Sequence, residues 1–167
     1  MLLHRIATIT AFAFTLCIPP ALAMPQTGNY YAAEVHKIIY PSPAVARPEL
    51  QHAIATATRQ NKNILLDFGG NWCGDCRVLD FYFHQPPNSG LLARNFILVD
   101  INVGQFHHNL GLAKKFNIPI HKGVPALAVL NSNGSLLYSQ TGGQFENMSR
   151  VSPTSVTAFL ELWKPSR

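Results

Sequence analysis

Two cysteines, Cys73 and Cys76, follow directly on an apolar stretch whose residues suit a buried strand. The stretch covers residues 64–68, and a Gly-Gly-Asn break at residues 69–71 is typical of a turn from a strand into a helix. The cysteine pair therefore falls where a helix begins. Unpaired N–H groups and the helix dipole stabilise a thiolate there, and the thiolate is the nucleophile of disulfide exchange. This spacing predicts a redox-active cysteine pair.

Within the pair, we predict that Cys73 is the nucleophile. Cys76, one helical turn further in, is then the less exposed thiol that resolves a mixed disulfide. Gly74 permits a tight start of the helix. Asp75 places a negative charge beside the thiolate, so it raises the pKa of Cys73 and lowers the reduction potential, while Arg77 partly opposes this effect. These neighbours favour a reductant or an exchanger of disulfides over a strong oxidant.

A structural disulfide and half of a zinc site are the alternative interpretations of the two cysteines. Zinc takes four ligands as a rule. The third cysteine, Cys17, lies in a segment that we expect to be removed, and the candidate histidines His107, His108 and His121 show no ligand spacing. The sequence therefore predicts no metal and no cofactor, and it favours redox chemistry.

An aspartate, Asp67, lies near the end of the first apolar strand. Burial would raise its pKa and let it take a proton from Cys76, which makes it a candidate catalytic residue. An ordinary strand-end aspartate is the alternative. A second apolar strand, predicted at residues 96–103, is interrupted by Asp100. If both carboxylates face the same side of the sheet, one of them stays protonated.

The pentapeptide at residues 72–76, Trp-Cys-Gly-Asp-Cys, resembles the Trp-Cys-Gly-Pro-Cys signature of the thioredoxin superfamily, with aspartate in place of proline. Asp67 matches the buried aspartate of that family, and Val124-Pro125 resembles its cis-proline loop. The similarity runs over residues 48–163 and is strongest to bacterial exported thioredoxin-like proteins. One departure is Asp100, which stands where thioredoxin has the lysine that partners the buried aspartate.

This resemblance implies an α/β thioredoxin fold, with a central mixed β-sheet flanked by helices and here extended at the N-terminus. It implies a cis peptide bond before Pro125, which would expose the backbone of Val124 for pairing with an extended substrate segment. The residues around the cysteines would shape the substrate site. The resemblance thus assigns substrate binding to Trp72, Gly74, Asp75, Val124 and Pro125.

Length and charge limit the organisation of the chain. At 167 residues it fits one domain, and its formal net charge is +5. The basic residues are scattered without a cluster, so the pattern does not indicate a nucleic-acid-binding protein. Residues 1–23 have the polar start, apolar region and small-residue cleavage site of a secretory signal peptide. We expect an N-terminal arm at residues 24–47 and the thioredoxin-like domain at residues 48–167.

The periodicity of the apolar residues predicts the remaining elements. We expect helices at residues 48–60, 74–83, 91–95, 110–116 and 154–163, and strands at residues 35–40, 126–130 and 135–140. An Asn-Gly pair between the last two strands indicates a hairpin. A polar Asn-Ser-Gly sequence at residues 88–90 is expected to cap the short third helix. Residues 145–151 form an insertion that could edge a substrate groove.

Export would place the mature protein in an oxidising compartment, the bacterial periplasm, and an uncleaved membrane anchor is the alternative. The sequence predicts a monomeric reductase or exchanger of disulfides in substrate proteins. A membrane-bound electron donor of the periplasmic thiol-reducing type would reduce its cysteine pair again after each reaction. Rival functions are a disulfide-forming oxidant and a reductase for cytochrome c maturation. A third, from another class, is a copper-binding or chaperone module with the thioredoxin fold.

Overall fold

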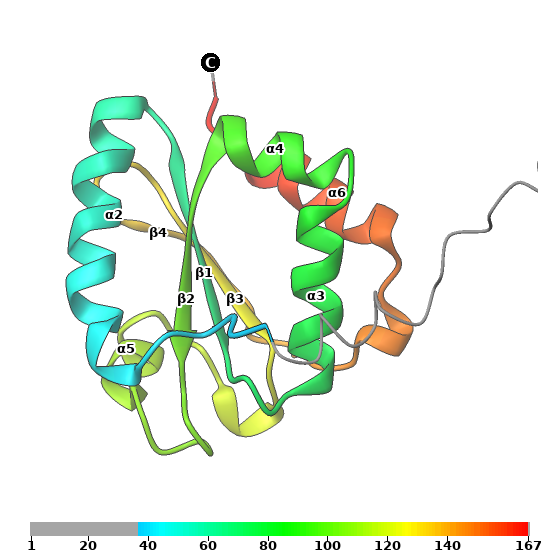
Figure 1. Cartoon of the computed structure of the whole chain (residues 1–167). Coiled ribbons are helices and arrows are strands. Elements are labelled where there is room, and N and C mark those ends of the chain that lie inside the picture. The colour runs from blue at the N-terminus through cyan, green and yellow to red at the C-terminus, as the bar shows by residue number, and fades with distance from the viewer. Residues whose placement is uncertain (1–36, 167) are drawn as a thin grey trace, which may run out of the picture. The chain divides into compact units, whose positions relative to one another are not determined.

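The structure, a computed structural model, describes residues 37–166 (Figure 1). The predicted signal peptide and the part of the predicted arm that precedes residue 37 lie outside the described residues and remain predictions. Between residues 37 and 166, no helix has the length and apolar character needed to cross a membrane.

A four-stranded mixed sheet forms the centre of the fold, in the order β2-β1-β3-β4. β1 (Asn63–Gly69) runs parallel to β2 (Phe96–Asn102) and antiparallel to β3 (Ala126–Leu130), which pairs with the antiparallel β4 (Leu136–Ser139). All residues of β1 and β3 are buried, as their continuous apolar sequences require of strands covered on both faces. The mixed sheet and its flanking helices confirm the predicted thioredoxin-like fold class.

Helices cover both faces of this sheet (Figure 1). On one face lie α2 (Ala46–Gln60) and the short α5 (Leu110–Lys115). The other face carries α3 (Gly74–His84), α4 (Asn88–Asn95) and α6 (Pro153–Trp163). Three short 3-10 turns, η1 (Pro43–Val45), η2 (Ile120–Lys122) and η3 (Met148–Arg150), lie in the connections.

The alternation of side chains along β1 divides the core into two layers. Ile64, Leu66 and Phe68 pack with the α2 side, whereas Leu65 packs with buried residues of α3, α4 and α6. Asp67 has the parity of Leu65 and is therefore directed to the face that α3 covers. The strand period thus places this carboxyl group on the same side of the sheet as the helix that carries Cys76.

The N-terminal arm differs from its prediction. Residues 37–40, the described part of the predicted edge strand at 35–40, form no strand. The turn η1 continues directly into α2, so this helix begins at Ala46, two residues before the predicted start. Tyr40 and Ala46 are both buried, at about 1% exposure. The end of the arm is therefore part of the core, held by side-chain contacts in place of strand pairing.

The predicted cap of α4 is also wrong. Asn88 belongs to the first turn of α4, Pro87 precedes that turn, and no side chain caps the helix. The Asn88 side chain is instead buried, donates to the carbonyl oxygen of Tyr82 and accepts from the hydroxyl of Thr157. It makes these bonds because α3 and α6 both pass beside α4, so Asn88 joins three helices.

Candidate active site

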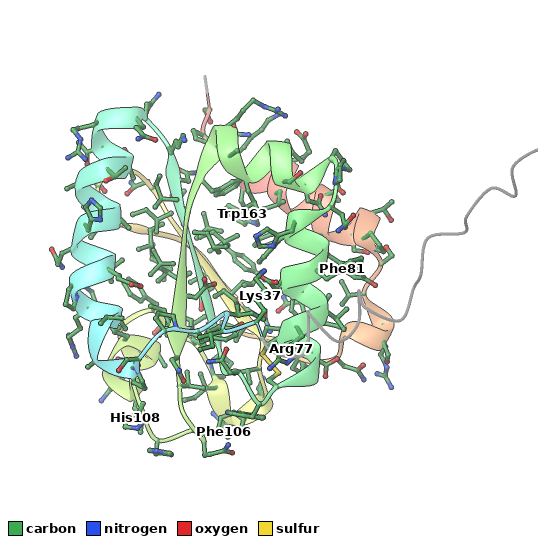
Figure 2. All side chains as sticks on the ribbon, in the orientation of Figure 1. Lys37, Arg77, Phe81, Phe106, His108 and Trp163 are labelled. Atoms are coloured by element: carbon green, nitrogen blue, oxygen red, sulfur yellow. A yellow bond between two sulfur atoms is a disulfide. The ribbon has the colours of Figure 1, made fainter. Side chains whose placement is uncertain are left out.

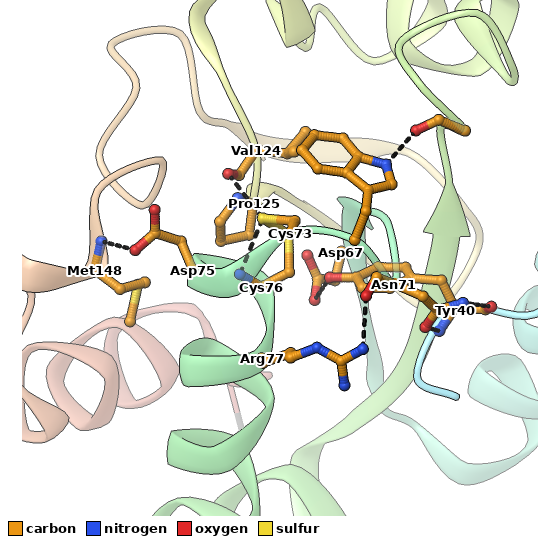
Figure 3. The surroundings of a disulfide bond; sticks show 12 residues. Tyr40, Asp67, Asn71, Cys73, Asp75, Cys76, Arg77, Val124, Pro125 and Met148 are labelled. Atoms are coloured by element: carbon orange, nitrogen blue, oxygen red, sulfur yellow. Dashed lines mark hydrogen bonds between the residues drawn. A yellow bond between two sulfur atoms is a disulfide. The ribbon is translucent and has the colours of Figure 1, made fainter. Parts of the chain in front are cut away.

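The cysteine pair lies where the sequence predicts it, at the start of α3, and its sulfur atoms are joined in a disulfide (Figure 3). Cys73 is the N-cap residue of the helix, and the backbone N–H of Cys76 points at its Sγ atom over 3.1 Å. Cys73 is 5% exposed and Cys76 is fully buried. In the reduced protein this N–H and the helix dipole would stabilise a thiolate on Cys73, which remains the better placed nucleophile.

The proline loop lies against the nucleophilic sulfur. The peptide bond between Val124 and Pro125 is cis, and the carbonyl oxygen of Val124 lies 3.4 Å from Sγ of Cys73. Gln140, which sequence reasoning missed, is 1% exposed; its side-chain amide donates to the Pro125 carbonyl and accepts from the Leu127 N–H. The loop is thus held from inside the protein beside the disulfide.

An exposed aromatic pair borders the cysteines. Trp72 is 45% exposed, and its indole N–H donates to the carbonyl oxygen of Gly104 over 2.6 Å. The ring of Phe106 meets the Trp72 ring edge-on at 5.2 Å, although Phe106 has a positive φ of 64° that is rare for a bulky residue. Figure 2 shows Phe106 at the end of the molecule where α3 begins. Sequence reasoning placed Trp72 beside the site and missed Phe106.

Asp75 has a structural partner as well as a charge. Its Oδ1 atom accepts a hydrogen bond from the backbone N–H of Met148 over 3.0 Å. The insertion predicted at residues 145–151 is anchored there, because Phe145 and Met148 are also buried in the core. Asp75 therefore links the residues between the two cysteines to the insertion, in addition to any effect of its charge on the Cys73 thiolate.

Two substitutions separate these roles of Asp75. In the reduced protein we expect Asp75→Asn and Asp75→Ala to lower the pKa of the Cys73 thiol alike, by up to about one unit, because both remove the negative charge. Only Asp75→Ala should also lower the urea midpoint of unfolding, because asparagine keeps an acceptor for the Met148 N–H. Thiolate absorbance against pH and urea titrations measure the two effects. Equal unfolding midpoints would show that the bond to Met148 does not anchor the insertion.

Arg77 is directed toward the turn and the arm. Its guanidinium group donates to the carbonyl oxygen of Asn71 over 2.6 Å and to that of Lys37 over 3.3 Å. These bonds join α3 to the turn before Cys73, which contains Asn71, and to the end of the N-terminal arm, which contains Lys37. The predicted opposition between Arg77 and Asp75 stays a prediction.

A cluster of three aspartates, Asp67, Asp80 and Asp100, lies on the α3 side of the sheet; we call it the carboxylate cluster. Asp67 and Asp100 stand in register on the paired strands β1 and β2, so they lie side by side, which is the arrangement for which the sequence analysis expects one of them to stay protonated. The Tyr40 hydroxyl donates to Oδ2 of Asp67 over 2.8 Å, and Oδ1 has no hydrogen-bond partner among the described residues. Asp67 is 1% exposed.

The pKa values of two of these aspartates are strongly raised. Burial raises the pKa of Asp67 well above its ordinary value, the Asp100 charge adds to this, and the Tyr40 hydrogen bond lowers it. Burial, with the charges of Asp80 and Glu49, raises the pKa of Asp100 to about 7, while Lys37 opposes the rise. At least one proton is therefore held in the cluster near neutral pH, because two adjacent buried carboxylates do not both ionise.

Asp80 was not singled out from the sequence. It lies four residues after Cys76, is 6% exposed, and pairs through Oδ2 with Nζ of Lys37 over 2.6 Å, with Nδ1 of His84 3.3 Å from its Oδ1. The available signal was the i, i+4 spacing from Cys76, which puts the carboxylate on the helix face that carries the buried cysteine. Lys37, the cation that pairs with Asp80, belongs to the N-terminal arm.

The other metal-ligand candidates do not converge. Over residues 37–166, no group of three or more His, Cys, Asp or Glu side chains could hold a metal ion. The His107 and His108 rings pack against each other, with centroids 4.3 Å apart, in the loop after β2, and His121 lies in η2.

Comparisons with known proteins agree with this geometry. A family model described as thioredoxin-like matches residues 45–132. The crystal structure of a disulphide isomerase from Xylella fastidiosa Temecula1 is 36% identical with a TM-score of 0.72, and the match covers 76% of this chain and 97% of that one. The reduced C-terminal domain of DsbD from Neisseria meningitidis is 23% identical with a TM-score of 0.51, over 71% of this chain and 96% of that domain, and shares the fold.

The thiol:disulfide interchange protein DsbD of Vibrio cholerae is 32% identical over 88 residues, which are 52% of this chain and 14% of that protein. The chain thus matches only a small part of that relative's length. Because the family model covers more than half of the chain and the Xylella fastidiosa structure is matched almost throughout, this chain belongs to the thioredoxin-like family, and it carries a Cys73–Cys76 disulfide at the start of α3.

Proposed function

We propose that this protein reduces or exchanges disulfides in exported substrate proteins. The observation that carries the proposal is the position of Cys73 at the start of α3. Its Sγ atom accepts a hydrogen bond from the backbone N–H of Cys76 and lies 3.4 Å from the Val124 carbonyl oxygen of the proline loop. A substrate segment bound along that loop would bring its own disulfide to this sulfur. The similarity to a disulphide isomerase, which the chain covers almost completely, supports an exchanging activity.

The proposed reaction has two exchange steps. The Cys73 thiolate attacks one sulfur of the substrate disulfide, so a mixed disulfide forms and the other substrate sulfur leaves as a thiolate. Cys76 loses its proton and attacks Sγ of Cys73, which releases the second substrate thiolate and closes the Cys73–Cys76 disulfide. Two electrons pass from the cysteine pair to the substrate. Asp67, directed to the face that α3 covers, is the proposed acceptor of the Cys76 proton.

A return of electrons completes the proposed cycle. The oxidised pair must receive two electrons from another dithiol before it can act again. In the periplasm, where the predicted signal peptide would deliver the protein, we propose a membrane-bound donor, because the cytosolic reductants do not reach that compartment. The donor's thiolate would attack Cys73, the more exposed of the two sulfur atoms, and Cys76 would leave. Trp72, Gly74, Asp75, Val124 and Pro125 are the proposed contacts for both substrate and donor.

The charges around the pair favour the reducing direction. Asp75 lies between the cysteines and disfavours a thiolate on Cys73, so the reduced form is less stable and the pair gives up electrons more readily. The buried carboxylate cluster acts in the same sense, because any negative charge it holds also disfavours a second charge nearby.

The reduction potential of the Cys73–Cys76 pair tests this direction. In equilibrium with glutathione redox buffers, we expect a value near that of thioredoxin, about −270 mV, and well below the roughly −120 mV of the strongest periplasmic oxidants. The Cys73 pKa measured in the same sample should accordingly not be strongly depressed. A potential near −120 mV would reverse the assigned direction and make the protein a disulfide-forming oxidant.

A further inference from the structure

The end of the N-terminal arm is bound to the turn that carries the cysteines. The side chain of Asn71 accepts hydrogen bonds from the backbone N–H groups of Ile39 and Tyr40, at 2.9 and 3.0 Å, and donates to the Tyr40 carbonyl over 2.7 Å. The Asn102 side chain donates to the Pro41 carbonyl over 2.8 Å. Since Asn71 lies two residues before Cys73, the position of the arm and that of the active-site turn are coupled (Figure 3).

These bonds position the side chain of Tyr40 next to Asp67. The Tyr40 ring is 1% exposed, and its hydroxyl reaches Oδ2 of Asp67 over 2.8 Å. Gly69 leaves the space for it, because a Cβ atom at Gly69 would overlap the Tyr40 hydroxyl and ring. In Figure 3 the Asp67 carboxyl group lies between Tyr40 and the cysteine pair. One carboxyl oxygen is thus held by the arm, and the other, Oδ1, has no hydrogen-bond partner within residues 37–166.

We propose, on the basis of the function above, that Tyr40 is a positioning residue for the resolving step: its hydroxyl group holds Oδ2 of Asp67 and leaves Oδ1 to exchange the proton of Cys76. In that step the Cys76 S–H bond breaks, the proton goes to Oδ1, and the new thiolate attacks Cys73. When the donor reduces the disulfide again, the same proton returns to the leaving Cys76 sulfur. No further co-reactant is needed.

The groups around Asp67 explain why such a partner matters. Asp100 faces it from β2 and Asp80 from α3, and both charges favour the protonated form of Asp67, as does burial. Lys37 from the arm and Glu49 from α2 act on Asp100. Among the described groups that shift the pKa of Asp67, only the hydrogen bond from Tyr40 lowers it and so favours the carboxylate that accepts a proton.

Tyr40→Phe removes this hydroxyl group and keeps the ring. We expect the pKa of Asp67, followed by carboxyl carbon NMR against pH, to rise by about one unit, because a hydrogen bond to a charged group is lost. The pH midpoint of the resolving rate, measured by stopped flow on a preformed mixed disulfide, should rise equally, with a fall of about ten-fold near neutral pH and recovery in alkali. Tyr82→Phe, which removes a phenol hydroxyl on α3 that is not among the groups shifting the pKa of Asp67, is the control and should leave both midpoints unchanged.

A second variant separates this role from packing. Fluorotyrosine at position 40 keeps the shape and donates a stronger hydrogen bond, so it should move the pKa of Asp67 downward, opposite to phenylalanine. If both variants only lower the unfolding midpoint, with the Asp67 titration and the pH profile unchanged, Tyr40 is a packing residue and the proposal is overturned. If the wild-type protein exchanges no disulfides, the proposed function fails, and the NMR titration still decides whether Tyr40 acts on Asp67.

Discussion

Replacing Cys73 by alanine is expected to reduce disulfide exchange to the rate of the buffer thiol alone. The remaining thiol, Cys76, is fully buried, so it cannot reach a substrate disulfide. No other group at the start of α3 can form the covalent intermediate. Reduction of a fluorescent disulfide peptide, with glutathione as the electron source, measures the effect. A Cys73→Ala protein that retains a substantial part of wild-type activity would show that Cys73 is not the attacking residue.

Replacing Cys76 by serine is expected to give the complementary result. Cys73 still attacks, but no thiolate resolves the product, so a mixed disulfide between the protein and its substrate accumulates. Non-reducing electrophoresis and mass spectrometry detect this species, and a thiol reductant should dissolve it. The double variant Cys73→Ala/Cys76→Ser is the matched control and should trap nothing. Trapping through any other residue would contradict the assigned order of the two cysteines.

The carboxylate cluster should make the folded protein less stable as the pH rises. The folded-state pKa values of Asp67 and Asp100 are raised above the ordinary value of 3.8. Below that value both folded and unfolded chains hold the protons, and the full stability is present. As the pH rises further, the unfolded chain releases its protons first, so stability falls until the pH passes the folded values, which for Asp100 means about 7.

Asparagine at either position should remove part of this loss. We expect Asp67→Asn and Asp100→Asn to be more stable than the wild type at mildly alkaline pH, on the order of a few kcal/mol, and to lose that advantage near pH 4. Urea unfolding of the oxidised proteins, followed by tryptophan fluorescence, measures the free energy at each pH. Glu161→Gln, which alters an exposed pair with Lys164, is the control. Parallel pH dependences in all four proteins would mean that the two aspartates titrate normally.

The local features of the site could be predicted from the sequence. An apolar run of strand length, a glycine-rich break and two cysteines at helical spacing put Cys73 and Cys76 at the start of α3, because strand and helix formation depend on neighbouring residues. The hairpin around the Asn-Gly pair at residues 133–134 follows from the same short-range rules. The apolar strand also marked Asp67 as a candidate, and the resemblance added Val124-Pro125.

The conformation of the N-terminal arm could not be predicted from such short-range rules. Residues 37–40 have the β-forming composition of a strand, yet they form none, because the backbone groups of Ile39 and Tyr40 bond to the Asn71 side chain more than thirty residues away. Tyr40, Phe106 and Gln140 were missed for the same reason: each acquires its place by contact with a distant segment. Asp80 had a local signal in its spacing from Cys76, but its partner Lys37 comes from the arm.

The sequence by itself determined the chemistry, because the reactivity of a thiol pair and the start of a helix are properties of a short segment. It also showed that Asp67 and Asp100 interrupt two apolar strands, whereas the pairing of β1 with β2 put them side by side. Only the tertiary structure decided their environment. It brought Tyr40 and Lys37 to the carboxylate cluster and Met148 to Asp75. The free energy of a buried charge depends on its interaction partners. Tertiary contacts, and not the spacing of residues in the sequence, bring these partners close to it.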